Sequence, residues 1–246
     1  MLFDPPQPGM GDYHAHVFRA GESYAPNPRY VPSYDATPED YLAVLSAHGL
    51  TWGTLVQPSF LGTNNTLIAE TMAQYPGHFR GVAVVDEADP SLTIPDVAKW
   101  HELGFRGIRV NAIGRSVPEF RTKEWEVFLR QMACHNWHLE LQVKPDVLVG
   151  LGSFLKSVPC FVVIDHFGLP ESDLIDEQPL LELALESENI WVKASGAYRT
   201  SPERVMNIFD KLRSKGFDRI VPGSDWPHTN YETAAVDAWK YFQELM

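Results

Sequence analysis

The segment TPEDYLAVLSAHGLTWGTLVQ, residues 37–57, contains the signals for one helix followed by one buried strand. Thr37 is a favourable N-cap, Pro38 suits the first helical position, and Gly49 is typical of a helix end. The run WGTLVQ then has the length and apolar content of a strand that is buried on both faces. A helix joined to a buried strand by a short connection is the repeating unit of parallel α/β folds.

The same unit recurs along the chain. Short apolar runs predict eight strands, at residues 13–18, 52–57, 81–85, 107–111, 138–143, 161–166, 190–195 and 220–225. Helix-like patterns lie between them, at residues 37–49, 122–135, 145–157, 178–188 and 201–216. This alternation predicts an α/β fold, a single-domain (β/α)8 TIM barrel over residues 1–246. A doubly wound open sheet is the alternative, although no GxGxxG motif follows an early strand.

The composition disfavours several classes of protein. The chain has 246 residues, a net charge of -12 and a pI near 5.1, which argues against binding to nucleic acid or to an anionic membrane. No apolar run is long enough to predict a membrane span, and the N-terminal MLFDPPQPGM lacks the pattern of a signal peptide. Cys134 and Cys160 form no CxxC pair. We therefore expect a cytoplasmic protein without a zinc–thiolate site, and the sequence makes no prediction about its oligomeric state.

Ionisable side chains gather where the predicted strands end, and in a TIM barrel these ends meet at the face that carries function. The first strand offers His14 and His16, which are two residues apart and therefore share one face. The fourth, sixth, seventh and eighth strands add Arg109, Asn111, Arg115, Asp165, His166, Arg199, Asp225, His228 and Asn230. The histidine pair has three possible interpretations at this point: a metal site, an acid–base site, or two core histidines.

Several motifs resemble those of one protein family over almost the whole chain. They are DYHAHVF (12–18), GFRGIRVN (104–111), VIDHFG (163–168), KASGAYR (193–199) and GSDWPHTN (223–230). The chain is similar to the amidohydrolase superfamily, and within it to the branch of 2-pyrone-4,6-dicarboxylate lactonases and related sugar-acid lactonases. The resemblance implies a (β/α)8 barrel that hydrolyses a small anionic lactone at the ends of its strands.

The resemblance also implies a role for each matching residue. Asp225 would be the general base that takes a proton from the attacking water. His14, His16 and His166 would polarise the lactone carbonyl or stabilise the tetrahedral intermediate, directly or through a metal ion. The residues implied to bind the substrate are Ser59, Arg109, Arg115, Arg199 and His228. Acyl hydrolysis requires an activated water and a stabilised carbonyl oxygen, and arginine is suited to binding carboxylates.

The predicted strands depart from the pattern of amidohydrolases that bind two metal ions. Those members have a bridging lysine on strand four and a histidine ligand on strand five. This chain has Arg109 and Asn111 on the first of these strands, and Glu140 and Gln142 on the second. We therefore expect no required cofactor, or a single divalent metal such as zinc. The ligands of such an ion would be His14, His16, His166 and Asp225.

Two other functions are compatible with these residues. A zinc-dependent decarboxylase of the same superfamily would use the same histidines and aspartate as metal ligands. A non-catalytic barrel that binds an acidic metabolite would need the arginines but would show no turnover. Leu169 stands where some dicarboxylate lactonases have a further arginine, so the number of carboxylates on the substrate is open.

Three polar residues within the predicted strands have structural interpretations. Asp12 lies near the start of the first strand, and we interpret it as a structural residue at the bottom of the barrel. Asp165 is next to His166 and is predicted to face the opposite way. Lys193 is predicted to form an ion pair inside the barrel.

Overall fold

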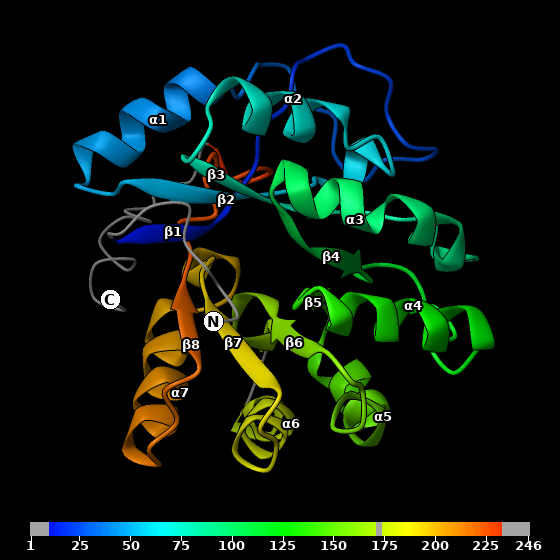
Figure 1. The fold of residues 1–246 in the computed structure, drawn as a ribbon. Coiled ribbons are helices and arrows are strands. Elements are labelled where there is room, and N and C mark those ends of the chain that lie inside the picture. The colour runs from blue at the N-terminus through cyan, green and yellow to red at the C-terminus, as the bar shows by residue number, and fades with distance from the viewer. Residues whose placement is uncertain (1–9, 171–173, 233–246) are drawn as a thin grey trace.

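The computed structural model describes residues 10–170 and 174–232, which form a ring of eight parallel strands with helices on the outside (Figure 1). Neighbours in the sheet follow the order of the chain. The strands are β1 (Gly11–Ala15), β2 (Trp52–Val56), β3 (Phe79–Ala83), β4 (Phe105–Asn111), β5 (His138–Gln142), β6 (Phe161–Ile164), β7 (Ile190–Ala194) and β8 (Ile220–Pro222). The predicted (β/α)8 barrel is confirmed. Residues 1–9 and 233–246 of the predicted domain lie outside the described residues.

The helices lie between successive strands and cover the outer face of the ring (Figure 1). They are α1 (Pro38–Ala47), α2 (Thr66–Gln74), α3 (Ile94–Leu103), α4 (Lys123–Cys134), α5 (Pro145–Leu155), α6 (Leu174–Leu185) and α7 (Pro202–Ser214). Thr37 and Ser201 cap α1 and α7 through their side chains, as the sequence predicts. Among the residues described, no helix is long and apolar enough to cross a membrane.

The predicted helices differ from the structure in two respects. α2 and α3 are absent from the prediction, and the residues before them, Asn65 and Thr93, are favourable N-cap types that make no side-chain capping bond in the structure. α6 begins before the predicted segment 178–188 and contains Pro179 inside it, whereas the sequence pattern suggested a start next to this proline.

The apolar core lies between the strands and the helices. The largest fully buried apolar side chains include Trp52, Phe105, Trp125, Phe128 and Trp137. The inside of the barrel is instead polar, and its buried charged or titratable residues include His14, Arg109, Glu140, Asp165 and Lys193. A buried charge is costly without a partner, so these side chains must pair with one another or with a ligand.

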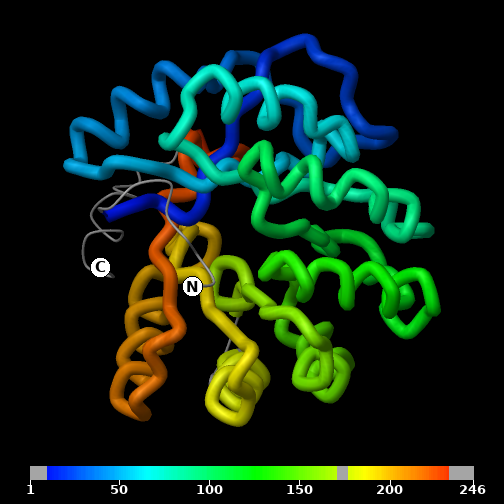
Figure 2. Tube along the Cα trace, viewed as in Figure 1, coloured from blue at the N-terminus to red at the C-terminus, as the bar shows by residue number. Residues whose placement is uncertain are grey.

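The barrel closes where residues 12–16 lie beside residues 224–226, a contact that we call the seam (Figure 2). The backbone N–H of Asp225 donates to the carbonyl oxygen of His14 at 2.8 Å, and the N–H of His16 donates across the seam at the same distance. The predicted first and last strands ran to residues 18 and 225, which is too far. β1 ends at Ala15 and β8 ends at Pro222, and beyond β8 the backbone leaves the extended region at Asp225, which has a left-handed φ of 61°.

Asp12 holds the seam together through its side chain. Its carboxylate accepts hydrogen bonds from the backbone N–H groups of His14 (3.0 Å) and Ser224 (2.8 Å). It also accepts from the hydroxyls of Tyr41 (2.8 Å) and Ser224. Burial, only partly offset by these hydrogen bonds, raises the pKa of Asp12 to about 6. The structural role predicted for Asp12 is confirmed, and its partners place it at the seam, where it binds Ser224 after the end of β8, and not only at the bottom of the barrel.

Gly107 in β4 marks a close approach to the neighbouring strand. A Cβ atom there would lie 2.6 Å from the carbonyl oxygen of His138 in β5, which is backbone held in the sheet. We expect Gly107→Ala to lower the free energy of unfolding by about 2–3 kcal/mol, measured by urea denaturation. Gly150→Ala in α5, where a Cβ meets open space, is the control and is expected to stabilise the protein by about 1 kcal/mol. Equal stabilities of the two variants would contradict the close approach.

Candidate active site

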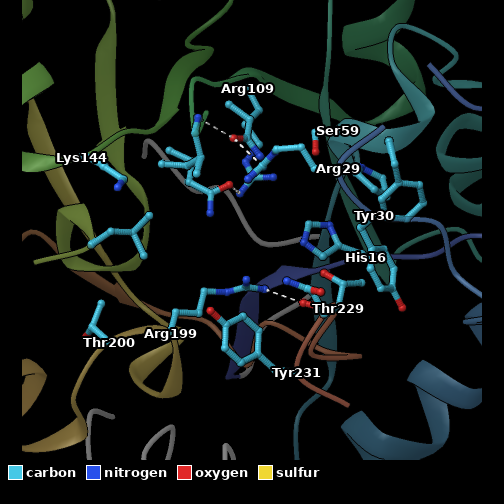
Figure 3. A pocket seen from close by; sticks show the side chains of 17 residues that line it. His16, Arg29, Tyr30, Ser59, Arg109, Lys144, Arg199, Thr200, Thr229 and Tyr231 are labelled. Atoms are coloured by element: carbon cyan, nitrogen blue, oxygen red, sulfur yellow. Dashed lines mark hydrogen bonds between the residues drawn. The ribbon is translucent and has the colours of Figure 1, made fainter. Parts of the chain in front are cut away.

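A cavity of about 210 Å³ opens at the C-terminal ends of the strands, the face on which the sequence predicts the site. Arg29, Arg109 and Arg199 point into it beside His16 (Figure 3). A second cavity of about 430 Å³ adjoins the first. The side chains shared by the two linings are those of Arg29, Ser59, Arg109, Asn111 and Ile113. The two cavities together form the candidate active site.

His14 and His16 lie in contact, with their Nε2 atoms 3.3 Å apart. Nδ1 of His16 is 2.7 Å from the carbonyl oxygen of Val56, which can only accept, so this nitrogen carries the hydrogen. Burial is the main cause that lowers the pKa of His16 to about 3 and that of His14 well below its usual value. Both rings are therefore neutral near pH 7, and the prediction that they share one face is confirmed.

Asp225 follows β8 and is fully buried. Its Oδ2 accepts hydrogen bonds from Nε of Arg199 (2.5 Å) and the hydroxyl of Tyr198 (2.6 Å). Its Oδ1 lies 3.7 Å from Nε2 of both His14 and His16, and has no hydrogen-bond partner among the residues that the structure describes. Burial alone would raise the pKa of Asp225, but Arg199, followed by two histidines, holds it well below its usual range. Asp225 is therefore an ionised carboxylate with one free oxygen.

The chain turns sharply after β6, because residues 166–169 all have φ between 50° and 69°. This left-handed turn ends the alternation of side chains along the strand. The prediction that Asp165 faces away from His166 is therefore wrong. Oδ1 of Asp165 lies 3.5 Å from Nδ1 of His14, and the ring of His166 packs against the same histidine at 4.8 Å between centroids.

His166 has one engaged and one free ring nitrogen. Its Nδ1 is 2.8 Å from Oγ of Ser195. Its Nε2 is buried and has no hydrogen-bond partner within residues 10–170 and 174–232. Burial is the main cause that lowers the pKa of His166 to about 4, so this ring is also neutral near pH 7.

The polar interior of the barrel consists of paired charges. Nζ of Lys193 contacts the carboxylate of Glu140 and lies 3.2 Å from Oδ1 of Asp165. Nε of Arg109 lies 2.9 Å from Oδ2 of Asp165, and its Nη2 donates to Gln142 at 2.9 Å. Burial alone would raise the pKa of Asp165, but Lys193 and Arg109 hold it well below its usual range. The predicted ion pair of Lys193 is confirmed.

The three arginines predicted to bind substrate each have an acidic partner. The pairs are Arg109 with Asp165, Arg115 with Glu87, and Arg199 with Asp225. Arg109 and Arg199 are mostly buried, whereas Arg115 is half-exposed and lines the second cavity. These pairs position the guanidinium groups, and each guanidinium keeps further N–H groups that can reach a ligand.

Arg29 is a fourth arginine of the site, and it is not among the residues predicted from the sequence. Its Nη2 donates to Oδ1 of Asn111 at 3.3 Å, and it has no acidic partner in the part of the chain that the structure describes. Burial, followed by three neighbouring arginines, lowers the pKa of Arg29 from its ordinary value. It stands in a proline-rich loop, where no strand or helix spacing points to its side chain. Arg29 is therefore a cation that an anionic ligand would stabilise.

The remaining predicted residues occupy different places. Ser59 lines both cavities, and Leu169 lines the first one. His228 is absent from both linings, and its Nδ1 lies 3.2 Å from the hydroxyl of Tyr198. Tyr198 itself was missed, although it is adjacent to Arg199 in the KASGAYR motif. The binding roles of Ser59 and His228 remain predictions.

The sequence leaves open whether the protein binds a single metal ion. Nε2 of His14, Nε2 of His16 and Oδ1 of Asp225 are 3.3–3.7 Å apart, as expected for ligands about 2.1 Å from one zinc ion. The hydrogen bonding does not fit this ion. Nδ1 of His14 lies 3.0 Å from Nζ of Lys193, which can only donate, so in the neutral ring Nε2 carries the hydrogen. A nitrogen that carries a hydrogen offers no lone pair to a metal.

A parallel eight-stranded barrel with two histidines at its first strand, one after the sixth and an aspartate after the eighth has the architecture of the amidohydrolase class. The agreement extends along the sequence. The family model described as Amidohydrolase matches residues 12–245, and the chain belongs to that family.

Three relatives show where in this family the chain lies. The 2-pyrone-4,6-dicarboxylate hydrolase of Comamonas testosteroni is 28% identical over 248 residues, which cover 93% of this chain and 80% of that protein. The 4-sulfomuconolactone hydrolase of Rhizobium radiobacter is 27% identical over 238 residues, 91% of this chain and 77% of that protein.

The third relative is a crystal structure, that of a probable 2-pyrone-4,6-dicarboxylic acid hydrolase from Acinetobacter baumannii with citric acid bound. It has a TM-score of 0.87 and 35% identity, over 96% of this chain and 91% of that chain. The resemblance inferred from the sequence is confirmed.

Proposed function

We propose that the protein hydrolyses the lactone ring of a small substrate that carries at least two anionic groups. The observation that carries this proposal is the state of Asp225, whose Oδ2 is held by Arg199 and Tyr198 while Oδ1 is free among the described residues. A buried ionised oxygen beside an arginine-lined cavity is suited to activating water for attack on an anionic substrate. The lactones in the names of two relatives support this class of reaction.

Asp225 takes the proton of the attacking water at Oδ1 in this mechanism. A substrate anion that shares Arg199 weakens the Arg199–Asp225 ion pair, and this makes Asp225 a stronger base. The water oxygen bonds to the lactone carbonyl carbon as the proton moves to Asp225. The ring C–O bond then breaks, the ring oxygen takes up the proton from Asp225, which restores the carboxylate, and the open-chain acid is the product.

His166 is the histidine with a ring nitrogen available to polarise the lactone carbonyl, although of the three histidines only His16 lines the first cavity. If the hydroxyl of Ser195 donates to Nδ1, the hydrogen of the neutral ring is on Nε2, which faces no other described partner. An N–H group in a buried site stabilises the developing negative charge on the carbonyl oxygen. The Nε2 atoms of His14 and His16 face each other, so they are less available for this role.

The arginines bind the anionic groups of the substrate. Arg29 is the natural anchor for one of them, because it has no acidic partner among the described residues and lines both cavities. Arg109 is a less direct probe of substrate binding, since its removal would also leave Asp165 without one of its two cationic partners. A guanidinium binds a carboxylate or sulfonate with two parallel hydrogen bonds.

We expect Arg29→Met to raise the KM for 2-pyrone-4,6-dicarboxylate about 10-fold to 100-fold, the effect of losing one charge-assisted hydrogen-bonded contact. The kcat should change much less, because Arg29 does not contact Asp225. The measurement is steady-state kinetics on this lactone and on an uncharged lactone, whose KM should stay the same.

Arg121→Met is the control for this variant. Arg121 is an exposed arginine outside both cavities, so its removal lowers the net charge equally without touching the site. A KM for the dicarboxylate that is the same in both variants would show that Arg29 does not bind the substrate.

The proposed function is tested with the purified protein and a panel of substrates. 2-Pyrone-4,6-dicarboxylate, 4-sulfomuconolactone and a sugar-acid lactone report ring opening, and a dihydroxybenzoate reports decarboxylation through release of carbon dioxide. Each assay is run with and without a chelator. Ring opening of one lactone supports the proposal. Decarboxylation that requires zinc, or binding of the lactones without turnover, would contradict it and favour one of the two other functions considered.

A further inference from the structure

Lys193 lies in β7 at the centre of the barrel and is 1% exposed. Its Nζ donates to the carboxylate of Glu140 and to Nδ1 of His14 at 3.0 Å, and it forms an ion pair with Oδ1 of Asp165 at 3.2 Å, an oxygen that accepts no hydrogen bond from the described residues. An ammonium group has three N–H groups and no acceptor. Lys193 therefore has two hydrogen-bond acceptors, Glu140 and His14, and a second carboxylate beside it.

The contact with Lys193 sets the direction of a chain of hydrogen bonds. Nδ1 of His14 accepts from the ammonium, so Nε2 of His14 carries the ring hydrogen and donates to Nε2 of His16 at 3.3 Å. Nδ1 of His16 then donates to the carbonyl oxygen of Val56 at 2.7 Å. Lys193, at one end of this series of hydrogen bonds, can only donate, and the carbonyl oxygen of Val56, at the other end, can only accept. Each ring hydrogen in the series therefore has a single position.

The opposite arrangement is disfavoured by the distances. A hydrogen on Nδ1 of His14 would face the ammonium of Lys193 at 3.0 Å, which places two donors against each other. The other acceptors for that hydrogen are farther away, at 3.5 Å for Asp165 and 3.7 Å for Glu140.

We propose that Lys193 is a positioning residue that keeps the hydrogen of His14 on Nε2 and thereby prevents a metal ion from binding between His14, His16 and Asp225. The three donor atoms have the spacing of a zinc site, and Lys193 withholds one of their lone pairs. This proposal rests on contacts inside the barrel and does not depend on the proposed reaction.

Removal of Lys193 should convert the same atoms into a metal site. Nδ1 of His14 would then carry the hydrogen and donate to Asp165 or Glu140, and Nε2 would be free to bind an ion. A histidine ligand that donates its second nitrogen to a carboxylate is the usual arrangement at zinc sites.

The first test uses the unaltered protein, with histidines labelled with ¹⁵N. Long-range ¹H–¹⁵N NMR spectra report which nitrogen of each ring carries the hydrogen, and His14→Gln and His16→Gln assign the two rings. We expect the nitrogen without hydrogen to be Nδ1 in His14 and Nε2 in His16. A His14 ring with its hydrogen on Nδ1 would overturn the proposal, and this result requires no variant of Lys193.

The second test measures zinc binding to the double variant Lys193→Met/Glu140→Gln. Replacing Glu140 as well avoids leaving a buried carboxylate without its partner. Competition with a chromogenic chelator should show one zinc ion per chain, bound about 10-fold to 100-fold more tightly than by the unaltered protein. Lys156→Met, which breaks a surface pair with Glu186, is the control and should leave zinc affinity unchanged.

Both measurements are made without substrate. They therefore test the proposal about Lys193 even if the protein hydrolyses no lactone. Equal zinc affinity of the folded double variant and the unaltered protein would overturn it. A double variant that fails to fold leaves the decision to the NMR spectra of the unaltered protein.

Discussion

Asp225→Asn is expected to lower kcat about 10²-fold to 10⁴-fold, the usual contribution of a general base. Asparagine has nearly the same shape, and its oxygen can still accept from Arg199 and Tyr198. It then presents an NH2 group where Oδ1 stands, so it can no longer take a proton from water. Substrate binding and folding should change much less than kcat. Steady-state kinetics on a lactone substrate and the circular dichroism spectrum separate these effects.

Asp218→Asn is the matched control for this variant. Asp218 is exposed and precedes β8, whereas Asp225 follows the same strand. The control removes one negative charge at the opposite end of the strand and should keep kcat within about twofold. An Asp225→Asn enzyme that retains most of its activity would remove Asp225 from the role of base.

Asp12→Ala is expected to lower the free energy of unfolding by about 4 kcal/mol, because four buried donors would lose their acceptor. For a chain of this size the midpoint of thermal unfolding should fall by about 10 °C. The effect should be large even though Asp12 touches neither cavity. Differential scanning calorimetry measures both quantities.

Two further variants show whether the lost hydrogen bonds cause this effect. Asp12→Asn keeps an oxygen acceptor in the same place and should cost less than Asp12→Ala. Asp210→Ala removes an exposed carboxylate from α7 and should change stability by less than about 0.5 kcal/mol. If Asp12→Ala were as stable as Asp210→Ala, the side chain of Asp12 would not hold the seam.

The barrel could be predicted from the sequence because its local signals agree with one another. Each strand is a short apolar run, and Thr37 and Ser201 mark helix starts that the structure confirms. The ends of strands were predicted less well. The sequence patterns at β1 and β8 continue past the last residue of each strand, so they do not show where the extended structure ends.

The site was predicted in part, and the errors have physical causes. Spacing within one strand is enough to place His14 beside His16. The orientation of Asp165 could not be predicted, because a left-handed conformation at three residues other than glycine has no clear sequence signal. The acidic partners of Arg115 and Arg199 depend on contacts between distant segments, and so does the lack of an acidic partner for Arg29.

The seam has a consequence for how the protein is made. Residues 12–16 and 224–226 lie near opposite ends of the described chain, and their contact brings His14, His16 and Asp225 together. Contacts between segments so far apart in the chain form late, because closing a long loop carries a large entropic cost. During synthesis on the ribosome, a chain with seven finished strands would have its histidines and arginines but not Asp225, the proposed base. Enzymatic activity would therefore appear only when the last strand has emerged, and its recovery would report the final step of refolding.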